Sequence, residues 1–122
     1  MTSDDSTFDA WLAGEIDAVE ASLASQGASC SLDRRREASP RLKHDEGRYA
    51  ALRLARRLGE RGDTLQALRD EAGKARAFLA SDSPLARDRA WVAYQQGLLE
   101  AAAQVLERAD AHGNAASTPP AH

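Results

Sequence analysis

The sequence predicts an all-α protein: a compact bundle of about four helices with a long C-terminal helix and a disordered C-terminal tail. The composition supports this, because the 122 residues include 26 Ala and 14 Leu but only four β-branched apolar residues. Ala and Leu are strong helix formers, whereas sheets favour β-branched and aromatic residues. Because aromatic residues make up only 5% of the chain, we expect a core of Leu and Ala in closely packed helices.

The first helix is expected from about residue 7 to residue 26. Ser6 and Asp9 have the spacing of a capping box, and Gly27 is expected to end the helix. Its apolar residues recur at helical spacing and define one face. These residues are Phe8, Trp11, Leu12, Ile16, Val19 and Leu23.

The second helix is expected to begin with Ser39 as the N-cap and Pro40 in the first turn. It should continue to about residue 58 and end among residues 59–62. Gly47 is a weak point at which this helix could break, because glycine is a poor helix former.

The third helix is expected to start after Asp63 and to run to about residue 80, and the fourth from Pro84, with Ser83 as its cap, to about residue 111. Apolar residues cover about half of the fourth helix, so it should lie between neighbouring helices. Residues 112–122 show no periodicity and are expected to be disordered. We therefore expect a single helical domain over residues 1–111.

Charge is strongly segregated along the chain. Residues 1–33 carry seven acidic and no basic residues, whereas residues 34–61 carry ten basic and four acidic residues. The remaining residues, 62–122, carry six basic and eight acidic residues. Such segregation indicates either an external charged partner or two segments that face each other. We expect the acidic first helix to lie beside the basic second helix.

The basic segment carries a candidate nucleic-acid surface, because several Arg side chains fall on one side of the second helix beside an aromatic ring. Such a surface could hold phosphates and stack a base. The alternative is a solvated or protein-facing surface, which the net charge of −3 favours, since nucleic-acid-binding domains are usually basic as a whole. The candidate residues are Arg34, Arg35, Arg36, Tyr49, Arg53, Arg56 and Arg57.

Two charged residues interrupt predicted apolar faces. Glu15 lies in the apolar face of the first helix, and Arg48 lies in that of the second. A buried charge without a partner is strongly destabilising. We therefore expect Glu15 and Arg48 to form an ion pair between the helices. The alternative is that both faces are partly open and both charges are hydrated.

A stripe of small residues runs along the fourth helix: Ala86, Ala90, Ala93, Gly97 and Ala101. Small side chains let two helices approach closely, which can offset the cost of a mid-helix glycine, about 1 kcal/mol relative to Ala. The stripe predicts a close helix contact, either inside the bundle or with a second copy of the chain in a homodimer.

The sequence contains no recognisable catalytic or metal-binding pattern. The helical neighbours of His44 are not metal ligands, and Cys30 is the only cysteine. There is no phosphate-binding glycine loop and no nucleophile elbow. We therefore expect no enzymatic activity, no metal and no cofactor. The apolar runs are too short for a membrane span and the acidic start does not resemble a secretory signal, so we expect a cytoplasmic protein.

The predicted role is non-catalytic binding of another macromolecule, as an accessory subunit, adaptor or inhibitor of a larger protein complex. A protein is the expected partner, with a second copy of the chain as one form of it. A helical subunit of a nucleoprotein assembly is the alternative. The candidate protein-binding residues are acidic residues of the first helix and small residues of the fourth: Asp9, Asp17, Glu20, Ala90, Ala93, Gly97 and Ala101.

Overall fold

The computed structural model describes the backbone of residues 3–30 and 39–117 and, within these ranges, the side chains of residues 7–26 and 39–111. All regular structure in this part of the chain is helical. The elements are α1 (Ser3–Cys30), α2 (Pro40–Arg61), α3 (Gln66–Leu79), the 3-10 helix η1 (Pro84–Arg87) and α4 (Arg89–Ser117). The prediction of an all-α bundle with a long C-terminal helix is therefore confirmed.

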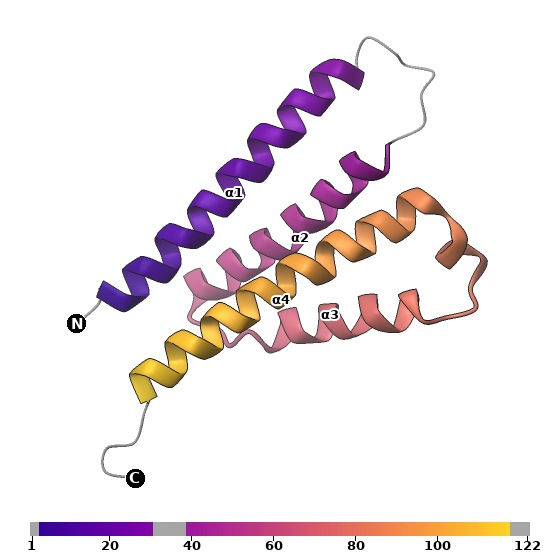
Figure 1. Cartoon of the computed structure of the whole chain (residues 1–122). Helices are drawn as coiled ribbons and strands as arrows, with labels where there is room; N and C mark the ends of the chain where they lie inside the picture. The colour runs from indigo at the N-terminus through magenta and orange to yellow at the C-terminus, as the bar shows by residue number, and fades with distance from the viewer. Residues whose placement is uncertain (1–2, 31–38, 118–122) are drawn as a thin grey trace.

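The helices α2 and α4 form the centre of the bundle and run side by side in the same direction (Figure 1). On one side α1 packs against both of them, and on the other side α3 packs mainly against α4. The guanidinium of Arg108 lies over the ring of Trp11, 4.7 Å from its centroid, and so attaches α1 to α4. Because α4 contacts α1, α2 and α3, its wide apolar surface is covered by several neighbours.

The contact between α2 and α4 depends on a glycine in each helix. A Cβ atom at Gly47 would overlap the carbonyl oxygen of Tyr94, and a Cβ atom at Gly97 would overlap the carbonyl oxygen of His44. The backbone of each helix thus fills the space that a side chain would need on the other. This close contact explains why α2 is continuous through Gly47, although glycine is a poor helix former.

The core consists mainly of Leu and Ala side chains, with a few β-branched residues. Each α-helix supplies one large side chain that is almost completely buried: Ile16, Leu52, Leu68 and Val105. Burying a side chain of this size stabilises the fold by about 1.5–3 kcal/mol. Among the described residues no charged or polar residue is buried, so the interior is uniformly apolar.

Both ends of α2 follow the sequence prediction. The Ser39 hydroxyl accepts a hydrogen bond from the backbone N–H of Leu42 at 3.1 Å, and Pro40 occupies the first turn. At the other end Gly62 has a φ of 73°, and its N–H donates to the Gly59 carbonyl. Glycine adopts this left-handed conformation without steric cost, which makes it an effective helix end.

The predicted limits of the first helix were wrong, because α1 begins at Ser3 and continues to Cys30. The backbone positions of Ser6 and Gly27 therefore both lie inside the helix. A glycine ends a helix by adopting positive φ. Among the described residues, Gly62 is the only glycine that does so.

The predicted fourth helix is divided near its start. The short η1 helix is capped by Ser83, and the chain is then extended at Asp88. The Asp88 carboxylate accepts a hydrogen bond from the backbone N–H of Trp91 at 3.0 Å, so Asp88 is the residue that caps α4. At its other end α4 continues past residue 111 to Ser117, and residues 118–122 lie outside the described part.

Among the described residues, no helix is both long enough and apolar enough to span a lipid bilayer.

Candidate functional site

The helices α1 and α2 lie side by side and run in opposite directions (Figure 1). Hydrogen bonds join the C-terminal half of α1 to the N-terminal half of α2. The Asp45 carboxylate accepts from the Ser22 hydroxyl and from the Gln26 amide, each at 2.6 Å. The Tyr49 hydroxyl donates to Glu20 at 2.9 Å. The acidic helix therefore lies beside the basic helix, as the segregation of charge predicts.

Arg48 joins three helices at the middle of the bundle. Its guanidinium lies 3.2 Å from Glu15 of α1 and 2.5 Å from Glu100 of α4, and its side chain is only 12% exposed. The expected contact between Glu15 and Arg48 is therefore present, and Glu100 is a second partner that the sequence pattern did not indicate. His44 lies beside this cluster, with its Nε2 atom 3.3 Å from the second carboxylate oxygen of Glu100.

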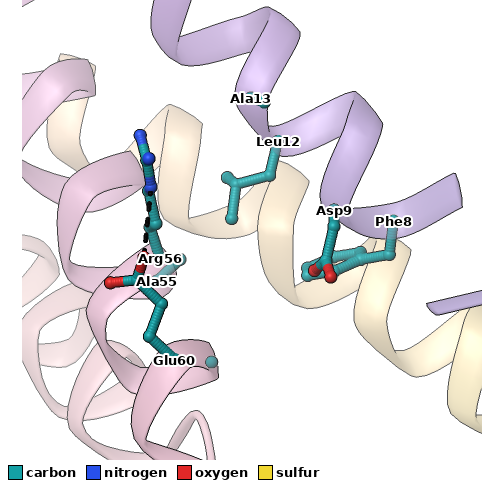
Figure 2. A pocket seen from close by; sticks show the side chains of 8 residues that line it. Phe8, Asp9, Leu12, Ala13, Ala55, Arg56 and Glu60 are labelled. Atoms are coloured by element: carbon teal, nitrogen blue, oxygen red, sulfur yellow. Dashed lines mark ion pairs between the residues drawn. The ribbon is translucent and has the colours of Figure 1, made fainter. Parts of the chain in front are cut away.

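Beyond Arg48, toward the C-terminus of α2, the two helices leave a surface cavity of about 310 Å³. Leu12 and Ala55 form a buried apolar floor, and Figure 2 shows Leu12 pointing into the space between the helices. Gly59 contributes no side chain, and a Cβ atom there would meet no atom within 4 Å. We call this cavity the α1–α2 groove. It is lined by Phe8, Asp9, Leu12, Ala13, Ala55, Arg56, Gly59 and Glu60.

The two edges of the α1–α2 groove carry different charges. Asp9 lies on the α1 edge, and Arg56 lies on the α2 edge with its Nε atom 3.6 Å from Glu60, as the dashed line in Figure 2 marks. Both members of this pair are more than half exposed, so the pair contributes little to stability. The edges are therefore open to a partner.

A second cavity of about 250 Å³ adjoins the groove and is lined by Arg53, Arg56, Arg57 and Glu60. We call its three basic residues, Arg53, Arg56 and Arg57, the arginine patch. Because Arg56 and Glu60 line both cavities, the arginine patch is continuous with the α1–α2 groove.

Tyr49, the aromatic member of the predicted nucleic-acid surface, contacts side chains of both α1 and α2. Arg53 donates a hydrogen bond to the Tyr49 hydroxyl at 2.8 Å, and its guanidinium lies 5.5 Å from the centroid of the ring. The same hydroxyl donates to Glu20, so Tyr49 links Arg53 to α1. Three other residues of the predicted surface precede α2 and lie outside the described residues: Arg34, Arg35 and Arg36.

The predicted protein-binding acids occupy different environments. Asp9 lines the α1–α2 groove, Glu20 is bound to Tyr49, and Asp17 is exposed. Asp9 is therefore the one of these three that lines the α1–α2 groove.

The small-residue stripe of α4 lies inside the bundle. Ala93, Gly97 and Ala101 are buried and Ala90 is half-buried, and the contact at Gly97 is with α2 of the same chain. These side chains contribute to close packing within one chain, so the buried ones are not available to a second copy.

Sequence reasoning missed the α1–α2 groove. Phe8 and Leu12 belong to the apolar face of the first helix, and the sequence pattern assigns all of that face to the core. Gly59 is the one hint in the sequence, because it removes a side chain from the last turn of α2. Where two helices separate depends on their packing against the rest of the bundle, which helical periodicity does not encode.

No group of three His, Cys, Asp or Glu side chains in the described ranges is arranged to hold a metal ion.

Comparison with known proteins gave no match to a protein-family model, to a curated protein or to a solved structure.

Proposed function

We propose that this chain is a non-catalytic binding protein whose α1–α2 groove holds apolar side chains from a helical segment of a protein partner. The groove itself is the observation that supports this function. Two antiparallel helices flank a cavity that has an apolar floor and charged edges. An amphipathic helix binds a surface of this kind by placing its apolar face in the groove.

The size and lining of the groove fit a few side chains of a partner. Its volume of about 310 Å³ is at the lower end of the range for ligand pockets, about 300–1,000 Å³. The half-buried Phe8 supplies apolar contact area above the floor of Leu12 and Ala55, and charged residues line the edges. Energetically important interface residues have this arrangement, with apolar anchors inside a polar rim. In this role the chain is an accessory subunit, adaptor or inhibitor of a larger protein complex.

The variant Gly59→Leu tests the proposal, because it fills the groove while leaving the fold intact. A Cβ atom at Gly59 meets no atom within 4 Å, and replacing a helical glycine removes a cost of up to about 1 kcal/mol. Gly14→Leu is the matched control. Gly14 is also an exposed helical glycine with open space at its Cβ position, but it does not line the groove.

The measurement compares proteins retained by the immobilised full-length wild type and by the two variants. Nuclease-treated extract of the cells that produce this protein is applied, and retained proteins are quantified by mass spectrometry. We expect a protein that binds the wild type and Gly14→Leu but is reduced about tenfold by Gly59→Leu, a change of about 1.4 kcal/mol. Equal retention by all three proteins, or no retention by the wild type, contradicts the proposal.

A second candidate function is contact with a nucleic-acid backbone through the arginine patch, since Arg53, Arg56 and Arg57 are exposed. The net charge of −3 weakens this candidate, since nucleic-acid-binding domains are usually basic as a whole. Phosphate affinity depends on several Lys or Arg contacts made together. Anisotropy titrations with single-stranded and duplex oligonucleotides at two salt concentrations separate the candidates, because failure to bind at low salt removes the nucleic-acid function for the isolated chain.

A further inference from the structure

The charges beside the groove indicate the chemistry of its partner. We infer that the partner segment is an acidic amphipathic helix, with apolar residues that enter the α1–α2 groove and acidic residues that lie on the arginine patch. This inference rests on the proposed function, because it concerns the same groove and names the class of partner.

The arginine patch has an excess of positive charge that the described part of the chain does not compensate. Of the residues that line the second cavity, three are Arg and one is Glu. Glu60 forms an ion pair with Arg56, at 3.6 Å. Within the described part of the chain, Arg57 has no carboxylate within ion-pair distance, and the partner of Arg53 is a neutral tyrosine hydroxyl. Carboxylates from another molecule could therefore form ion pairs with Arg53 and Arg57.

The position of the excess charge ties it to the groove. Arg56 and Glu60 line both cavities, so a helix seated in the groove would lie directly beside the arginine patch. Apolar anchoring and charge pairing are then available to the same partner. Complementary charge of this kind contributes mainly to specificity and to the rate of association.

The opposite edge of the groove sets the orientation of the partner. Asp9 lies on the α1 edge, where it would repel a second acidic row and favour neutral or basic residues. An acidic partner is therefore expected to turn its acidic side toward α2 and its neutral side toward α1. Repulsion on one edge and attraction on the other together define specificity.

The test uses two synthetic peptides, each about 16 residues long and with the same stripe of Leu residues. In one peptide Glu flanks the stripe on one side, and in the other Lys occupies the same positions. Binding to the full-length protein is measured by fluorescence anisotropy. We expect the Glu peptide to bind the wild type about tenfold more tightly than the Lys peptide, and this preference to shrink as salt is added.

Charge reversal of the arginine patch provides the matched comparison. The double variant Arg53→Glu/Arg57→Glu should bind the Lys peptide more tightly than the Glu peptide. The control is Arg76→Glu/Arg87→Glu, which makes the same change in net charge at two exposed arginines of α3 and η1 that line neither cavity. This control should keep the preference of the wild type. Thermal melts of all variants show whether the fold is retained.

The outcomes separate the inference from the proposed function. If both peptides bind equally and Gly59→Leu abolishes binding, the groove function stands and the acidic partner is wrong. If the Glu peptide is preferred but Gly59→Leu has no effect, the proposed function of the groove is wrong. No binding of either peptide overturns the inference. A competition experiment can also overturn it, with a single-stranded oligonucleotide of equal charge as the competitor. If the oligonucleotide displaces the labelled Glu peptide as effectively as unlabelled Glu peptide does, the patch recognises charge alone and the inference is wrong.

Discussion

The side chain of Arg48, a residue of α2, connects this helix to α1 and α4. Its guanidinium is largely covered, whereas Glu15 and Glu100 are 35% and 49% exposed. The charge of the guanidinium is therefore compensated mainly by its two partners, whereas water can still hydrate both carboxylates. The geometry also requires an arginine, since a lysine has no planar fork that reaches two carboxylates at once.

Replacing Arg48 with Met keeps much of the apolar stem but removes both ion pairs. We expect the free energy of unfolding to fall by about 1.5–3 kcal/mol, the range for hydrogen bonds to charged groups. Glu15→Gln should cost less than about 1 kcal/mol, because Glu100 still holds the guanidinium and the lost pair is partly exposed. Urea denaturation of the two single variants and of the double variant gives the coupling free energy between Glu15 and Arg48. Equal losses in the two single variants would mean that Glu100 contributes nothing.

The contact between Glu15 and Arg48 could be predicted because each residue interrupts an otherwise apolar helical face. Glu100 could not be predicted in the same way. It lies on an exposed part of α4, where an acidic residue needs no partner and gives no signal in the sequence. Patterns thus identify charges that are out of place, but not the ordinary surface charges that complete them.

At the scale of the elements, the crossing of α2 and α4 is fixed by backbone atoms. Gly47 and Gly97 lie opposite carbonyl groups of Tyr94 and His44. A flexible side chain can move away from a methyl group, but a carbonyl group that belongs to a helix can move only with that helix. Any added side chain would therefore force the two central helices apart and disturb the core around them.

We expect Gly47→Ala and Gly97→Ala each to lower the free energy of unfolding by about 3 kcal/mol or more, the upper range for overpacking. The loss should occur although Ala is the better helix former by about 1 kcal/mol. The matched controls are Gly14→Ala and Gly73→Ala, helical positions where a Cβ atom meets nothing within 4 Å. These controls should raise stability slightly. Urea denaturation measures all four, and a neutral Gly97→Ala would disprove the tight crossing.

The sequence predicts helix types well and helix ends less well, for a physical reason that α4 illustrates. Ser83 and Asp88 are both good N-caps and are five positions apart, so local chemistry allows a helix to start after either. The structure uses both, one for η1 and one for α4. In α1 no residue near Gly27 opposes helix formation strongly enough to stop it, because a mid-helix glycine costs only about 1 kcal/mol. The separation of α1 from α2 at Gly59 follows from tertiary packing, and the missing side chain of Gly59 is its one local signal.

At the scale of the whole molecule, the opposite charges of α1 and α2 cancel across the contact between them. Within the described side chains α1 carries acidic residues and no basic ones, whereas α2 carries an excess of basic residues. Contacts such as Glu15 with Arg48 and Glu20 with Tyr49 lie along this boundary. The fold therefore gains from attraction between helices while the exposed side of α2 keeps the arginine patch.

Because this attraction acts between partly exposed groups, stability should depend on salt. Raising the NaCl concentration from about 0.01 M to about 1 M shortens the Debye length from about 30 Å to about 3 Å. We expect the free energy of unfolding to fall by about 1 kcal/mol, the scale of a few exposed ion pairs. Urea is the appropriate denaturant, since it adds no ions. The double variant Glu15→Gln/Arg48→Met should show a smaller dependence, and stability that rises with salt in the wild type would show that repulsion dominates.

The paired glycines also bear on how this sequence can evolve. A substitution at position 47 or 97 alone displaces both central helices, so selection should remove it before a second change arrives to compensate. Natural variants of this chain are therefore expected to keep both glycines. Those that replace them should do so together with larger neighbouring side chains that fill a wider gap.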